Sequence, residues 1–119
     1  MSDIIEWVLE MEVREGQVEN VQPLLDEMVK ATKANEPGAL HYEYYMPEDR
    51  STCTVLERYA DNDAILVHLQ NFGAHFAERF LAVFAPVRFT LYGPANEEVM
   101  SALAGFGATN QKMVAGFHR

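Results

Sequence analysis

The spacing of apolar residues changes along this chain from every second position to every third or fourth position, and then changes back. Residues 3–13 alternate between apolar and polar side chains, which is typical of a strand that buries one face. Residues 17–36 instead place apolar side chains three or four positions apart, and this spacing predicts an amphipathic helix. The helix is expected to end at Glu36, because a residue that precedes proline avoids the helical region.

The two periods alternate through the rest of the chain. They predict a hairpin of strands at 39–46 and 52–60, a long helix, a strand at 87–93, a short helix at 97–104 and a last strand within 111–117. The long helix is expected to begin at a cap formed by Asp61 or Asn62, to divide near Gly73 and to end at Pro86. Gly38, which follows Pro37, suits the centre of a type II turn before the second strand.

This order of strands and helices predicts an α+β, ferredoxin-like βαββαβ fold. We expect one domain over residues 1–119, in which a core of about residues 3–93 forms an antiparallel sheet with two helices on one face. Residues from about 94 to 119 would add a helix–strand extension. The other sheet face would expose Val8 and either Val55 or Leu56. An exposed apolar sheet face is usually an interface, so we expect a homodimer that packs through it.

Composition and charge narrow the classes of partner. The 119 residues carry a net charge of −9, so nucleic acid and anionic membranes are not expected as partners. No apolar run is long enough to span a membrane and no basic segment precedes an apolar one at the start, so we expect a cytoplasmic protein. Cys53 is the single cysteine, which leaves no intrachain disulfide and no zinc-ligand spacing. We therefore expect no metal site.

Several motifs resemble the antibiotic biosynthesis monooxygenase family of dimeric α+β barrels. The sequence EPGALHYEYY at residues 36–45 is followed by a hairpin and by LERYADNDAILVHLQNFGAHF, and this arrangement is similar to that of the family. The matching positions are Glu36, Pro37, Gly38, Glu57, Tyr59, Asp61, Ala64, His68, His75 and Phe76. The resemblance covers roughly residues 4–92 and implies the dimeric barrel fold.

The resemblance also implies an activity, which is oxygenation without a metal or flavin and therefore without a cofactor. The substrate would be a small apolar aromatic or quinol-type molecule whose anion hands an electron to oxygen. The protein would have to supply an apolar pocket between sheet and helices, a base, and groups that stabilise the developing oxyanion.

The candidate site residues come from the sheet and from the second helix. The catalytic candidates are His68 and His75, whose side chains suit proton transfer near neutral pH, and Tyr44, whose hydroxyl can bind a substrate oxygen. The ligand-binding candidates are Trp7, Tyr42, Phe72, Phe76, Phe80 and Arg88. Core packing is the commoner role for such aromatic residues, and Arg88 can instead pair with Glu57 or Glu10.

The sequence is also compatible with two other functions. A non-catalytic dimer that binds a small apolar or fatty-acid-like ligand would need the same pocket without the base. The haem-degrading branch of the family uses an Asn on the first strand, and a Trp and a His on the second helix. In this chain the first strand has no Asn, His68 takes the position of that Trp, and Phe80 takes the position of that His, so haem degradation is the less favoured alternative.

Overall fold

The computed structural model describes residues 2–119 and follows the predicted order of strands and helices. The elements are β1 (Ile5–Val13), α1 (Val18–Asn35), β2 (Ala39–Tyr45), β3 (Thr52–Tyr59), α2 (Asn62–His75), α3 (Ala77–Val83), β4 (Phe84–Tyr92), α4 (Glu97–Leu103), the 3₁₀ turn η1 (Ala104–Phe106) and β5 (Thr109–Gln111). Each change of the hydrophobic period along the chain therefore marks a change of secondary structure.

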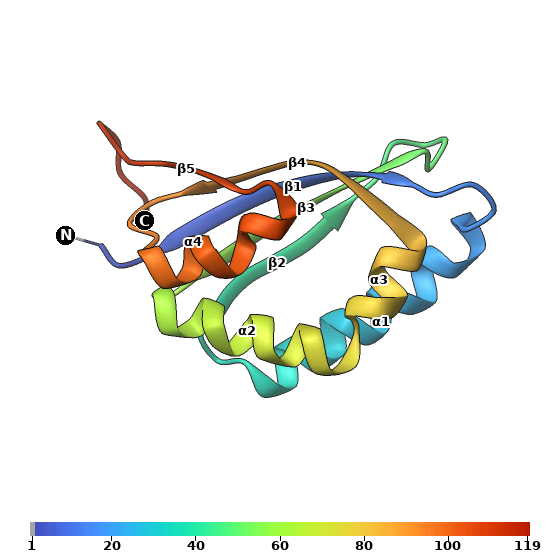
Figure 1. Ribbon diagram of the computed structural model, residues 1–119, viewed down its shortest axis with the longest axis horizontal. Helices are drawn as coiled ribbons and strands as arrows, with labels where there is room; N and C mark the ends of the chain where they lie inside the picture. Colours follow the sequence, from blue (N-terminus) through green and yellow to red (C-terminus); the bar gives the residue numbers. More distant parts are fainter. Residues whose placement is uncertain (1) are drawn as a thin grey trace.

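The five strands form one sheet in the order β2-β3-β1-β4-β5. The pairs among β1 to β4 are antiparallel, whereas β5 runs parallel to β4. Figure 1 shows α1, α2 and α3 together against one face of this sheet, with α4 beside one end of α2. The chain therefore has the predicted α+β, ferredoxin-like fold with a C-terminal extension. None of the described helices is long and apolar enough to cross a membrane.

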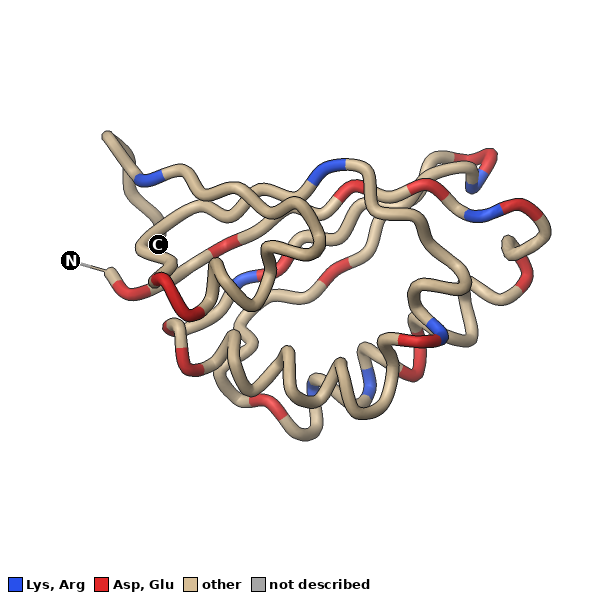
Figure 2. The backbone as a smooth tube through the Cα atoms, in the orientation of Figure 1, with Lys and Arg blue, Asp and Glu red and all other residues tan. Residues whose placement is uncertain are grey.

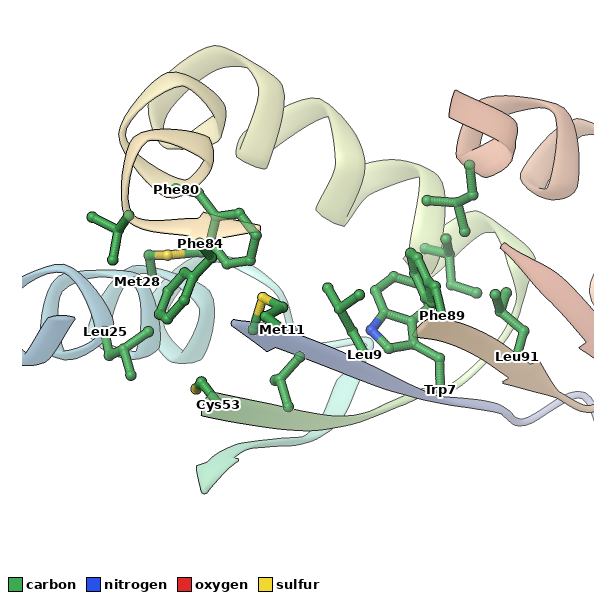
Figure 3. Packing of buried hydrophobic residues seen from close by; sticks show 14 of the residues in the cluster. Trp7, Leu9, Met11, Leu25, Met28, Cys53, Phe80, Phe84, Phe89 and Leu91 are labelled. Carbon is green, nitrogen blue, oxygen red and sulfur yellow. The ribbon is translucent and has the colours of Figure 1, made fainter. Parts of the chain in front are cut away.

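The core lies between the sheet and this layer of helices. Trp7, Leu9 and Met11 of β1 point toward the helices and are buried, as the alternation predicts. In Figure 3, Met28 of α1 lies beside Phe80 of α3 and Phe84 of β4. Burying each such side chain stabilises the folded state by about 1.5–3 kcal/mol. This cluster therefore holds the helices against the sheet.

The second helix is divided, but not where the sequence predicts. Gly73 stays inside α2, with open space around the position where a side chain would begin. The chain leaves the helix at Phe76, which has φ −130° and ψ −20°, and α3 starts at the next residue. A single glycine costs a helix only about 1 kcal/mol, so packing outweighs it here.

The helix also ends earlier than predicted. It stops at Val83, and β4 already begins at Phe84, so Pro86 lies within the strand instead of ending the helix. Pairing between β1 and β4 shifts register between Glu10 and Met11, opposite this proline. Proline cannot donate a hydrogen bond to the strand ladder, so strands tolerate it where the ladder is irregular.

The last strand is shorter and earlier than predicted, since β5 covers Thr109–Gln111 and not a segment within 111–117. Asn110 fixes it to β4, because its Nδ2 donates to the backbone oxygens of Leu91 at 3.3 Å and Gly93 at 3.1 Å. Gln111 pairs with Tyr92, the final residue of β4. The strand ends there because its partner ends there, and residues 112–119 are exposed.

The turn before β2 is closed as predicted but is not of type II. The Ala39 N–H donates to the Glu36 carbonyl at 3.0 Å, yet Gly38 is not among the described residues with positive φ, which type II requires. Glycine is needed at this position for a different reason. A Cβ on Gly38 would lie 2.6 Å from the Cβ of Ala64, so the turn presses directly against the start of α2.

This close approach gives a testable prediction about stability. Gly38→Ala is expected to destabilise the chain by about 1–3 kcal/mol, because the added methyl group collides with Ala64. Ala64→Gly should relieve the collision, so the double variant should lose less than the sum of the two single losses. Urea unfolding measures all three values. Gly73→Ala is the control and should stabilise α2, since nothing lies within 4 Å of its Cβ position; a Gly38→Ala protein as stable as Gly73→Ala would refute the contact.

Candidate active site

A buried carboxyl group stands on the inner face of the sheet. Glu57 shares this face of β3 with Val55 and Tyr59, and only 5% of its surface is exposed. The Trp7 indole N–H donates to Glu57 Oε2, and the Tyr59 hydroxyl donates to Glu57 Oε1. Trp7 is the register partner of Glu57 on the neighbouring strand, so the pairing of β1 with β3 builds this contact.

His68 joins Glu57 to a second buried carboxyl group. Its ring lies on α2, with Nε2 at 3.4 Å from Glu57 Oε1 and Nδ1 at 2.8 Å from Glu36 Oε1. Glu36 caps the end of α1, and its other oxygen accepts from Asn71 Nδ2 at 3.3 Å. An imidazole thus stands between two carboxyl groups within the helix–sheet core.

The surroundings raise the pKa values of Glu57 and His68. Burial raises the pKa of Glu57, and this effect exceeds the opposing charge of His68 and the hydrogen bonds from Tyr59 and Trp7. Burial alone would lower the pKa of His68, but its hydrogen bond to Glu36 and the charges of Glu57 and Glu36 outweigh burial and raise that pKa. A carboxylate with a raised pKa is a stronger base than one in water, which is the property that proton abstraction needs.

Two tyrosine hydroxyl groups lie near Glu57 and His68. The hydroxyl groups of Tyr42 and Tyr44 are 2.7 Å apart and hydrogen-bond to each other. Burial, as the largest cause, raises the pKa of both residues above the usual range of tyrosine. The hydroxyls therefore keep their protons at neutral pH, and they can donate to a negatively charged oxygen.

These groups face a small apolar cavity of about 40 Å³. It is lined by Trp7, Leu9, Met28, Tyr42, Tyr44, Glu57, His68, Leu69, Phe72, Phe80, Phe89, Leu103 and Phe106. The last two belong to the C-terminal extension, which closes one side. In Figure 3, Trp7, Leu9 and Phe89 cluster on the sheet. The volume suits water-sized molecules and is far below the roughly 300–1,000 Å³ of ordinary ligand pockets.

The structure brings together most of the residues that the sequence singled out. His68, Tyr44, Trp7, Tyr42, Phe72 and Phe80 all line the cavity. His75 and Phe76 line a groove on the outer side of the helices. Arg88 lies on the opposite face of the sheet, where its Nε is 4.0 Å from Glu10 Oε2. Of the two partners expected for Arg88, it therefore lies next to Glu10 and not Glu57.

The sequence reasoning missed the two carboxyl groups as site residues. Glu57 was recognisable, because it holds a position of β3 at which every second residue is otherwise apolar or aromatic. A charged residue at such a position must find partners in the core. Glu36 matches the turn motif of the family, but the hydrophobic pattern did not mark it as buried, since a glutamate at the end of a helix is usually exposed.

The fold is that of a known family. The antibiotic biosynthesis monooxygenase family matches residues 4–86, and the chain belongs to it. No protein with a curated description matches the chain.

Three solved structures show how far the likeness extends. MupZ from Pseudomonas fluorescens is 22% identical with a TM-score of 0.85, and the match covers 99% of this chain and 96% of that one. A candidate antibiotic biosynthesis monooxygenase from Caulobacter crescentus CB15 is 25% identical, with a TM-score of 0.66 over 80% of this chain and 92% of its own. SnoaB, a cofactor-independent oxygenase from Streptomyces nogalater, is 18% identical, with a TM-score of 0.65 over 80% of this chain and 96% of its own. The match to MupZ thus includes the C-terminal extension.

Proposed function

We propose that the protein is a cofactor-independent monooxygenase that acts on a small apolar aromatic or quinol-type molecule between the sheet and the helices. The observation that carries this proposal is the buried Glu57 carboxyl group, which faces an apolar cavity beside His68 and has a raised pKa. Membership of the monooxygenase family supports it, as does the similar fold of SnoaB, a cofactor-independent oxygenase.

The chemistry follows from what these side chains can do. The Glu57 carboxylate removes a proton from an acidic C–H or O–H group of the substrate, and the resulting anion transfers one electron to O₂. The radical pair then combines to a peroxide. For an anthrone, loss of water from this peroxide converts CH₂ and O₂ to C=O and H₂O, which balances atoms and electrons. His68 stabilises the negative charge of the Glu57 carboxylate by pairing with it. The Tyr42 and Tyr44 hydroxyls donate hydrogen bonds to the substrate oxyanion.

Oxygen uptake tests this proposal directly. The purified protein, treated with a chelator, is mixed with anthrone or 1,4-naphthohydroquinone in an oxygen-electrode cell. We expect uptake above the spontaneous rate, with one O₂ consumed for each anthraquinone formed from anthrone. If both compounds bind without oxygen uptake, the proposal fails and the alternative of a non-catalytic protein for apolar ligands gains support.

We also propose that two copies of the chain pack through the outer face of the sheet. Val8 and Leu56 lie on that face and are half-buried in the single chain, whereas Val55 points inward. Leu40, Tyr45 and Val87 are 52%, 53% and 63% exposed at strand positions. Covering these apolar side chains with a second sheet would remove them from water, which is the usual driving force for such a dimer.

Leu56→Glu is therefore expected to convert a dimer to a monomer, because it places a charge at the centre of the proposed interface. Light scattering during size-exclusion chromatography measures the mass. Val18→Glu is the control, since Val18 is 44% exposed at the start of α1, on the helical side of the molecule. A wild-type chain with the mass of a monomer would refute this interface.

A further inference from the structure

The cavity beside Glu57 is too small for an aromatic substrate, but a larger space lies on the other side of the helices. A groove of about 490 Å³ runs between α1 and α2. It is lined by Met28, Ala31, Thr32, Asn35, Glu36, Val67, His68, Asn71, Phe72, His75 and Phe76. This volume lies within the range of ordinary ligand pockets. Met28, His68 and Phe72 line both the groove and the cavity, so they form the wall between them.

Phe72 is the part of this wall that can move at the lowest cost. Met28 is only 2% exposed, and the His68 ring is held by carboxyl groups on both sides. Phe72 is half-buried and has no polar atom to keep satisfied. Its ring meets Phe80 edge to face, with centroids 5.1 Å apart. A change of its side-chain rotamer breaks no hydrogen bond, and it would join the groove to the cavity.

The charge pattern of the groove favours an uncharged ligand. No Lys, Arg, Asp or Glu occurs in α2 from Ala64 to His75, although the chain has a net charge of −9. Figure 2 shows this helix without charged residues over nearly its whole length, while charges mark most other elements. Among the described residues, the one charged side chain in the groove lining is Glu36, which is buried and hydrogen-bonded to His68 and Asn71. The amides of Asn35 and Asn71 and the imidazole of His75 can hydrogen-bond a hydroxyl or carbonyl group.

We propose that the substrate passes between α1 and α2, with Phe72 as the gate, and that the joined groove and cavity hold one substrate molecule along its length. Its reactive carbon or hydroxyl lies against Glu57 and His68, and a polar group at its far end lies beside Asn71 and His75. This inference rests on the proposed function for the identity of the reacting end. It gives the predicted site residues His75 and Phe76 a place in the outer half of the site.

Two other routes into the cavity are less favourable. A groove between α1 and the β2–β3 hairpin, of about 610 Å³, reaches the cavity at Tyr44. Opening it requires breaking the hydrogen bond between Tyr44 and Tyr42, and its rim carries Lys30, Lys33 and Arg50. The third route, at the C-terminal extension, is closed by Leu103, which is 1% exposed.

Methionine methyl groups can tell these routes apart, because Met46 and Met100 each mark one of the two less favourable routes, whereas Met28 lines both the proposed groove and the cavity. Met28 lies in the wall at Phe72, Met46 lies in the groove beside the hairpin, and Met100 lies on α4. The protein is labelled with ¹³C at its methionine methyl groups and titrated with 1-aminoanthracene, a flat aromatic that needs no oxygen. We expect a saturable shift of the Met28 signal while Met46 and Met100 stay in place. A shift of Met46 or Met100 overturns the route, whether or not the Met28 signal also shifts, because Met28 lines the cavity that all routes reach.

Variants of the gate give a second measurement. Phe72→Ala is expected to lower the Kd for 1-aminoanthracene by about fivefold, because the open state no longer has to be populated first. Phe72→Trp should raise the Kd by a similar factor. The control is Val29→Ala in the hairpin groove, for which the Kd should stay unchanged. Unfolding in urea confirms that each variant is folded. If Phe72→Ala does not fold, the Met28 signal of the wild-type protein still tests the route. An unchanged Kd in both Phe72 variants refutes the gate.

The route and the proposed function can fail separately. Binding that shifts Met28, without oxygen uptake from anthrone, would leave the route standing and remove the monooxygenase. Oxygen uptake with a shift of Met46 or Met100 alone would support the monooxygenase and refute the route.

Discussion

Replacing Glu57 by glutamine is expected to reduce oxygen uptake with anthrone by about 10²–10⁴-fold, the usual contribution of a positioned general base. Glutamine has nearly the same shape and keeps an oxygen that can accept from Trp7 or Tyr59, but it cannot take the substrate proton. The loss should fall on kcat more than on KM, because the proton moves only in the transition state. Initial rates at saturating anthrone measure it.

The matched control for this experiment is Glu27→Gln. Glu27 is an exposed residue of α1 whose carboxylate pairs with Arg79 at 2.8 Å, and it does not line the cavity. Its removal should leave oxygen uptake unchanged and alter stability by no more than about 0.5 kcal/mol. If Glu57→Gln retains more than half of the wild-type rate, another group is the base and the proposed chemistry is wrong.

Replacing His68 by leucine is expected to destabilise the protein by about 3–5 kcal/mol at pH 7.5, as removal of one member of a buried charge pair usually does. The change leaves Glu36 and Glu57 buried without the imidazole between them. Urea unfolding measures the loss. His75→Leu is the matched control, because His75 lies on the same helix but is exposed, and it should cost little.

The pH dependence gives the sign of this effect. The folded chain holds the pKa of Glu57 above its ordinary value of 4.5, so the folded state binds more protons than the unfolded state as the pH rises from 4.5 through the raised value. Stability must therefore fall over that window, and the His68→Leu protein should regain stability when the pH is lowered from 7.5 to 5. In the wild type the raised pKa of His68 acts in the same direction, since its contribution is complete below 6.5 and is lost through its folded value.

A double variant separates this explanation from simple loss of packing. Adding Glu57→Gln to His68→Leu removes one of the two uncompensated carboxyl groups, so the double variant should be more stable than His68→Leu alone at pH 7.5. The outcome that contradicts the electrostatic account is a double variant whose losses add, with no gain in stability on acidification.

Much of the fold could be predicted from the sequence, because strands and helices each repeat their apolar residues with a fixed period. Trp7 and Leu9 share the buried face that alternation assigns to them. Local patterns failed where tertiary packing decides. Pro86 is tolerated by an irregular strand pair, and Gly38 is required by a helix that approaches from elsewhere in the chain, so neither role is visible in the neighbouring sequence.

The site was predicted in part, and the missing part has a physical reason. His68 and the aromatic residues were identifiable by residue type and by their resemblance to a family. The link from Glu36 through His68 to Glu57 depends on the distance between the end of α1 and the middle of β3, which are brought together only by folding. The size of the cavity depends on packing at the level of single methyl groups, and hydrophobic periodicity carries no information on that scale.

The cavity takes its acid–base groups from the core of the fold and two of its walls, Leu103 and Phe106, from the C-terminal extension. Part of the fit is therefore encoded in a different stretch of the gene from the acid–base groups. Substitutions in the extension can reshape the cavity without touching Glu57 or His68, so new substrates can be accepted in small steps while the reaction is preserved. For an engineer, the same separation makes residues 94–119 the first segment to randomise when a different molecule is to be oxidised.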